Sequence, residues 1–149
     1  MTSAEPGALD SREPRVRELV SRLYDGLTDR HGEPMFEHMR QVAEHCEPTN
    51  RIIGWLHDVA EDGLMSLDEL QRDVPLSSAE REALGLLTRP PSLTYRDYIE
   101  RIAASQTAAG QIARSVKRAD LSANLARPPH PDHPKLLERY LAALERLGG

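Results

Sequence analysis

The sequence predicts an all-α protein, a compact single-domain bundle of about seven or eight helices. Apolar residues recur three and four positions apart along most of the chain, which places them on one face of a helix. The alternation of apolar and polar residues that is typical of a half-buried strand is missing from the sequence. Aromatic residues make up only 4% of the 149 residues, so aliphatic side chains must fill the core. We expect a loose polar tail at residues 1–11 and one helical domain at residues 12–149.

The helices are predicted in order from apolar spacing and from the residues that start and stop them. Gly32 and Pro34 mark a loop before the second helix, where Pro34 is placed to open it. Ser66 and Ser77 are each followed three positions later by Glu, the pattern of a capping box at a helix start. The expected ranges are 14–27, 34–46, 49–62, short helices beginning after residues 66 and 77, one from residue 94, one at about 111–127 and one at about 134–147.

Charge and cysteine content exclude several classes of function. The net charge of -5 and the pI of about 5.7 argue against general affinity for nucleic acid or an anionic membrane. A small anionic ligand stays compatible with them if a metal and local basic groups reverse the field. Cys46 is the only cysteine, which excludes an intramolecular disulfide and a cysteine zinc framework. We expect a cytoplasmic protein with no membrane partner, because the chain shows neither a signal peptide nor a run of about 20 apolar residues. We also expect a monomer or small homo-oligomer with no nucleic-acid partner.

Four side chains that bind metals or move protons fall within two turns of the third predicted helix. They are His57, Asp58, Glu61 and Asp62, with members four positions apart expected one above the other. A neutral imidazole next to a carboxylate suits Mn²⁺, Fe²⁺ or Zn²⁺. Gly54, one turn earlier, would allow another backbone to approach this helix.

A rigid metal site needs ligands from more than one helix. His38 and Asp120 lie on the polar edges of two other predicted helices. Together with the His-Asp pair they give two imidazoles and two carboxylates, which leaves positions open for water and a phosphate oxygen. Lys117, Asp120 and Asn124 form a polar stripe on a helix otherwise rich in core residues, which favours a functional role for that face.

Three motifs then carry a resemblance to a known family. They are Gly-Glu-Pro-Met-Phe-Glu-His at 32–38, Leu-His-Asp-Val-Ala-Glu-Asp at 56–62, and Val-Lys-Arg-Ala-Asp at 116–120 followed by Asn124. In order and spacing the chain resembles, over about residues 28–127, the HD-domain phosphohydrolases, and among them the small hydrolase-only relatives of the RelA/SpoT-type alarmone enzymes. The resemblance implies a helical bundle of the HD-domain type that removes the 3′-diphosphate from guanosine tetra- or pentaphosphate.

The resemblance also implies roles for individual residues. His38, His57, Asp58 and Asp120 would bind Mn²⁺, or another divalent metal such as Fe²⁺, Zn²⁺ or Co²⁺. Glu61 and Asp62 would handle the attacking water as the catalytic residues, and Asn124 would contact the substrate.

Further substrate-binding candidates come from the residues near these motifs: Arg30, His31, Lys117 and Tyr95. The loop at residues 29–32 differs from the basic run that the family usually has, so three functions stay open. They are hydrolysis of guanosine 3′,5′-polyphosphates, hydrolysis of another nucleotide such as a deoxynucleoside monophosphate or NADPH, and metal-dependent nucleotide sensing without turnover. The Glu61-Asp62 pair favours an enzyme, because a pure binder needs no proton-transfer group there.

Overall fold

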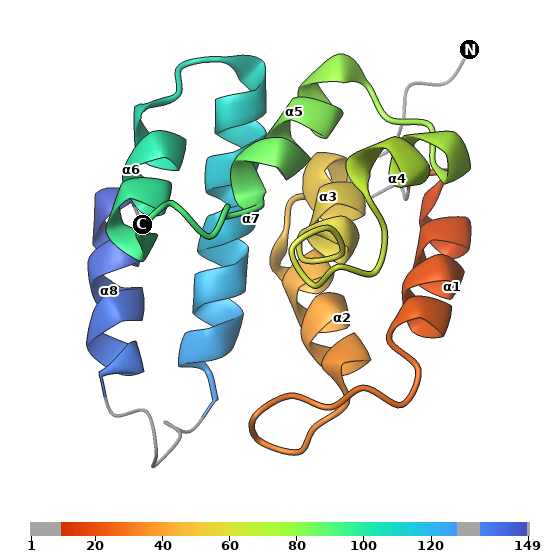
Figure 1. Cartoon of the computed structure of the whole chain (residues 1–149), viewed down its shortest axis with the longest axis horizontal. Coiled ribbons are helices and arrows are strands. Elements are labelled where there is room, and N and C mark those ends of the chain that lie inside the picture. Colours follow the sequence, from red (N-terminus) through yellow and green to blue (C-terminus); the bar gives the residue numbers. More distant parts are fainter. Residues whose placement is uncertain (1–9, 128–134, 149) are drawn as a thin grey trace.

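The structure, a computed structural model, describes residues 10–127 and 135–148, which form eight α-helices and one short 3-10 helix (Figure 1). The predicted all-α class is confirmed, and the only β-type pairing among the described residues is an isolated bridge between Thr28 and Pro34. The elements are α1 (Glu13–Leu23), α2 (Met35–His45), η1 (Pro48–Asn50), α3 (Arg51–Leu56), α4 (Leu67–Asp73), α5 (Ser78–Leu87), α6 (Tyr95–Ala104), α7 (Ala108–Leu125) and α8 (Leu136–Arg146).

The longest helix, α7, packs against α2, α3, α5, α6 and α8 and so joins the two sides of the molecule. Figure 1 shows α6, α7 and α8 on one side, and α1 to α4 on the other. The core between them is mainly aliphatic, as the low aromatic content predicts, and Trp55 is its largest fully buried side chain. Within the described part of the chain, none of the helices has the length and apolar character needed to cross a membrane.

Two ion-pair networks fix α1 against the rest of the bundle. The buried carboxylate of Glu13 accepts hydrogen bonds from the guanidinium of Arg51 at 2.8 Å and from Nε1 of Trp55 at 2.9 Å, which ties α1 to α3. Arg12 donates to both carboxylate oxygens of Glu80 at 2.8 Å, which ties the start of α1 to α5. Position and orientation of α1 therefore depend on paired charges as well as on apolar contact.

The helix starts follow the predicted capping chemistry. Oγ of Ser66 accepts from the N–H of Glu69, and Oγ of Ser77 accepts from the N–H of Glu80, both at 3.1 Å, so both predicted capping boxes are confirmed. Thr107 caps α7 by accepting from the N–H of Gly110 at 3.0 Å, which starts this helix three residues before the predicted position 111.

Several predicted helix ends are wrong by a few residues. The first helix stops at Leu23 rather than at residue 27, because the chain turns through Gly26 with φ of +77°. The helix predicted at 111–127 ends at Leu125. The last helix begins at Leu136, and the predicted start at residue 134 lies outside the described residues. Residues 1–9 of the expected tail lie outside them too, while Asp10 accepts hydrogen bonds from Arg12.

The third predicted helix, 49–62, is also wrong at its end, since α3 stops at Leu56. The carbonyl oxygen of Gly54, which the N–H of Asp58 would need in a continuing α-helix, accepts a hydrogen bond from Nδ1 of His57 at 2.7 Å. The next backbone bond, from the N–H of Val59 to Leu56, spans only three residues. The segment then turns away at Gly63, whose φ is +73°. One helical feature is kept, a 2.8 Å bond from the N–H of Asp62 to the carbonyl of Asp58.

The expected close approach at Gly54 is confirmed. A methyl group at this position would lie 2.9 Å from Sγ of Cys46 and 3.0 Å from Cα of Ala43. The backbone of α2 therefore lies where a side chain at Gly54 of α3 would be. This close crossing sets the distance between His38 on α2 and His57 after α3.

Candidate metal centre

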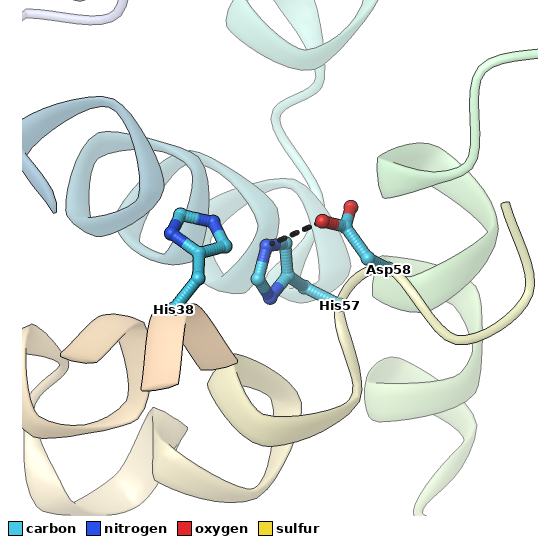
Figure 2. A group of neighbouring side chains, drawn as sticks. All are labelled: His38, His57 and Asp58. Carbon is cyan, nitrogen blue, oxygen red and sulfur yellow. Dashed lines mark ion pairs between the residues drawn. The ribbon is translucent and has the colours of Figure 1, made fainter. Parts of the chain in front are cut away.

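The four predicted metal ligands converge from three parts of the fold. His38 lies on α2, His57 and Asp58 follow the end of α3, and Asp120 lies on α7. Figure 2 shows the first three side chains pointing toward one another, and their ligand atoms all lie within 4.8 Å of one another. Oδ1 of Asp120 is 2.9 Å from Nε2 of His38 and 3.4 Å from Nε2 of His57. Residues up to 82 positions apart in sequence thus meet in one cluster.

The orientation of His57 is fixed by the end of α3. Because a carbonyl oxygen only accepts, Nδ1 of His57 donates to Gly54, so Nε2 carries the lone pair of the neutral ring. Nε2 is 3.2 Å from Oδ2 of Asp58 and 3.4 Å from Oδ1 of Asp120. It is buried and has no well-directed hydrogen bond to any described residue. A lone pair facing two carboxylates at this depth requires a cation or a proton between them.

The ionisation of the cluster follows from that requirement. Burial disfavours the charged imidazolium of His57, yet the carboxylates of Asp58 and Asp120 hold its pKa well above the ordinary value. Burial also disfavours a charged Asp120, but Lys117 and His57 hold its pKa well below the ordinary value. Either a proton on Nε2 of His57 or a divalent ion would balance the two carboxylates. Two imidazoles and two carboxylates are a borderline nitrogen and oxygen donor set, and binding of a divalent ion would displace that proton.

A second layer of side chains orients Asp120. Its Oδ2 accepts from Nζ of Lys117 at 2.7 Å, and Nδ2 of Asn124 lies 3.4 Å from its Oδ1. Lys117, Asp120 and Asn124 share one face of α7, as their spacing predicts. Of the predicted substrate contacts, Lys117 and Asn124 therefore already touch a candidate ligand.

His38, Asp58 and Asp120 line a cavity of about 330 Å³. Predicted site residues that line it are Arg30, His31, His38, Asp58, Glu61, Tyr95, Lys117, Asp120 and Asn124. His57 is 2% exposed and is not among the residues that line the cavity. Three of the four predicted ligands and the predicted substrate contacts are thus brought to one cavity by elements that span most of the chain.

The two predicted catalytic carboxylates take different positions. Glu61 is exposed, lines the cavity, and accepts a 2.7 Å hydrogen bond from the backbone N–H of Arg89. Asp62 is not among the residues that line the cavity, and its Oδ2 accepts a 2.7 Å hydrogen bond from the hydroxyl of Tyr24. Glu61 is therefore the better placed of the two to meet a ligand in the cavity.

The cavity lining also includes residues that the sequence reasoning did not assign to a site, among them Arg89, Arg127, Arg139 and Tyr140. The guanidinium of Arg139, on α8, lies 4.8 Å from the ring centroid of Tyr95. Arg127, just after α7, pairs with Asp29 in the loop before α2. Charged positions on an amphipathic helix are common on any surface, so the sequence of α8 carries no signal that singles out Arg139.

The cavity has the opposite charge balance to the whole chain. Among the described residues, five cationic side chains line it, Arg30, Arg89, Lys117, Arg127 and Arg139, against four carboxylates, Asp29, Asp58, Glu61 and Asp120. The chain as a whole carries a net charge of -5. A divalent ion bound by the candidate ligands would add two more positive charges, so the loaded cavity would attract anions.

Comparison with known proteins gives no identification. No protein-family model matches the chain, and no curated protein matches its sequence.

Proposed function

We propose that the protein is a metal-dependent phosphohydrolase of the HD-domain type that acts on a phosphorylated nucleotide. The leading candidate reaction removes the 3′-diphosphate from a guanosine 3′,5′-polyphosphate and releases pyrophosphate. One observation carries the proposal: Nε2 of His57 is buried between two carboxylates beside a cavity rich in cationic side chains. That arrangement suits a divalent cation and, above it, an anionic ligand.

Within this proposal His38, His57, Asp58 and Asp120 hold the metal, with Mn²⁺ as first choice and Fe²⁺, Zn²⁺ or Co²⁺ as alternatives. A divalent ion in such a site lowers the pKa of water and polarises a phosphoryl oxygen. Glu61 accepts the proton of the attacking water, since its carboxylate is exposed at the cavity and positioned by the N–H of Arg89. Asp62 supports this segment through its bond to Tyr24.

The remaining cavity residues bind the substrate. Arg30 and Arg139 offer guanidinium groups of the kind that bind phosphate in a bidentate manner. Tyr95 offers an aromatic wall, and its hydroxyl is buried with no hydrogen-bond partner among the described residues, which suits a polar group of the ligand. His31 lies at the same cavity. A volume of about 330 Å³ suits a small molecule rather than a polymer.

A screen of nucleotides with the metal-loaded protein tests the proposal, provided that the products are identified. Guanosine tetraphosphate should give pyrophosphate. Release of orthophosphate from a deoxynucleoside monophosphate or from NADPH, with guanosine tetraphosphate untouched, would replace the substrate and keep the metal chemistry. Tight nucleotide binding with no product would instead identify a sensing module and refute the hydrolase.

A further inference from the structure

We infer that Lys117 is the residue that makes the loaded centre selective for an anion, a role that rests on the proposed metal-dependent function. The charge of a divalent metal and the charges of its two carboxylate ligands cancel. The ammonium group of Lys117 therefore leaves the centre with one excess positive charge. It thereby weakens metal binding and strengthens the binding of a phosphoryl group. Lys117 is a positioning residue in this sense, because its hydrogen bond is with Asp120 and its charge at the cavity wall acts on the entering anion.

The position of Lys117 is unusual for a lysine. The residue is only 9% exposed, and its Nζ is 2.7 Å from Oδ2 of Asp120. The same nitrogen lies 5.8 Å from the ring centroid of Tyr95 and 5.4 Å from that of Tyr98. The ring of Tyr98 is itself fixed, because its hydroxyl donates to the carbonyl of Leu87 at 2.7 Å. Two aromatic faces and one carboxylate therefore hold a charged ammonium group at a depth where lysine is rare.

Stability alone does not explain this lysine. A buried ion pair contributes little net stability, because removing two charges from water costs about as much as their attraction returns. A pair of apolar residues in place of both Lys117 and Asp120 would fill the same space without that cost. The other oxygen of Asp120 is the one that faces the histidines, at 2.9 Å from Nε2 of His38. Lys117 thus occupies one carboxylate oxygen and leaves the other to the metal position.

The charge count of the centre gives the consequence. The four ligand residues supply two carboxylates and two neutral imidazoles, so a divalent ion brings their sum to zero. Lys117 then adds one positive charge at the wall of the cavity. Exposed Glu61 is better solvated and screened than the buried ammonium, so it offsets this charge only in part. An anion entering the cavity is the group that restores neutrality.

Lys117→Met should therefore move two affinities in opposite directions. Without its counter-ion Asp120 becomes a better partner for the metal, so Mn²⁺ should bind about tenfold more tightly to the variant. Inorganic phosphate should bind about tenfold more weakly to the Mn²⁺-loaded variant, because the variant lacks the excess positive charge that attracts the anion. A lysine that only supported the fold would weaken both affinities together.

Calorimetric titration of Mn²⁺, and then of phosphate into the loaded protein, measures both quantities without reference to turnover. Lys117→Arg keeps the charge and should retain phosphate affinity within about threefold. Arg72→Met removes one exposed charge from α4, away from the cavity, and should change neither affinity. If Lys117→Met proves unfolded without metal, the arginine variant and the metal-loaded methionine variant still give the phosphate comparison.

Each outcome has one reading. A wild-type protein that binds no divalent metal refutes the proposed function. If the wild-type protein binds Mn²⁺, three results would overturn the inference and leave the proposed function intact. The first is a loaded wild type that fails to bind phosphate, and the second is a Lys117→Met variant that binds phosphate as well as wild type. The third result is a Lys117→Arg variant that loses as much phosphate affinity as the methionine variant. Opposite shifts in the methionine variant, with both control variants unchanged, support it.

Discussion

Replacing Gly54 with alanine should loosen the crossing of α2 and α3 on which the candidate metal centre depends. The new methyl group would lie 2.9 Å from Sγ of Cys46 and 3.0 Å from Cα of Ala43, and both distances are shorter than van der Waals contact. The second neighbour is backbone, so a side-chain rotation cannot relieve the clash. The two helices must move apart, and they carry or lead into His38 and His57.

The net effect can be worked from two opposing contributions. Overpacking in a dense core costs about 1–3 kcal/mol. Alanine in place of glycine in a helix returns up to about 1 kcal/mol. A net loss of about 1.5 kcal/mol in the free energy of unfolding corresponds to a melting temperature about 3–6 °C lower for a chain of this size. Mn²⁺ affinity should fall as well, since the spacing of the two histidines changes.

Gly85 provides the matched control. It also lies in a helix, α5, but a methyl group there would meet only Cδ1 of Leu67 at 3.9 Å, which is ordinary contact. Gly85→Ala should raise the melting temperature by about 2–4 °C. Thermal unfolding of both variants decides the matter. If Gly54→Ala is as stable as Gly85→Ala and binds Mn²⁺ like wild type, the close crossing has no role in building the site.

Three further predictions concern the metal, the division of roles and the response to acid. Metal at a hundred times its dissociation constant should add about 2.7 kcal/mol to the free energy of unfolding, so an unchanged melting temperature after verified chelation would count against the site. Asp120→Ala should lower both metal occupancy and turnover, whereas Glu61→Gln should keep its metal and lose about 10²–10⁴ in rate; a Glu61→Gln protein that is fully active or metal-free would reverse that assignment. Hydrogen bonds from Arg12 lower the pKa of Glu80, so their stabilisation is present above about pH 4.3, the value in an unfolded chain, and is lost as pH falls through the lower folded value. Arg12→Met should reduce that acid dependence in urea unfolding, and an unaltered profile would show that the pair contributes nothing.

The sequence predicts most of the fold because its local signals agree. Helical spacing, the capping serines at 66 and 77 and the proline breaks all act within a few residues, and the structure follows them. The errors lie where a long-range or side-chain contact decides the outcome. The helix that holds the His-Asp pair ends early because the imidazole of His57 takes the carbonyl that the next turn needs. Apolar spacing carries no information about that competition.

The convergence of the four candidate ligands could be predicted in part, and the rest of the cavity could not. His38 and Asp120 lie on the polar edges of two predicted helices, and His57 and Asp58 form one motif, which is visible in the sequence. Arg139 and Tyr140 enter the cavity because α8 folds back along α6 and α7. That placement depends on tertiary packing. The resemblance implies one shared role for Glu61 and Asp62, yet the two side chains meet different partners.

Gly54 connects the packing of the core to the chemistry of the centre through two separate atoms. Its missing side chain lets α2 approach α3, which brings His38 within reach of the cluster. Its carbonyl oxygen binds Nδ1 of His57, which ends the helix and turns Nε2 toward Asp58 and Asp120. An alanine would disturb the first function directly and the second only through movement of the helix. A metal affinity that falls further than the loss of fold stability explains would therefore show that the placement of the two histidines, and not the stability of the fold alone, depends on this residue.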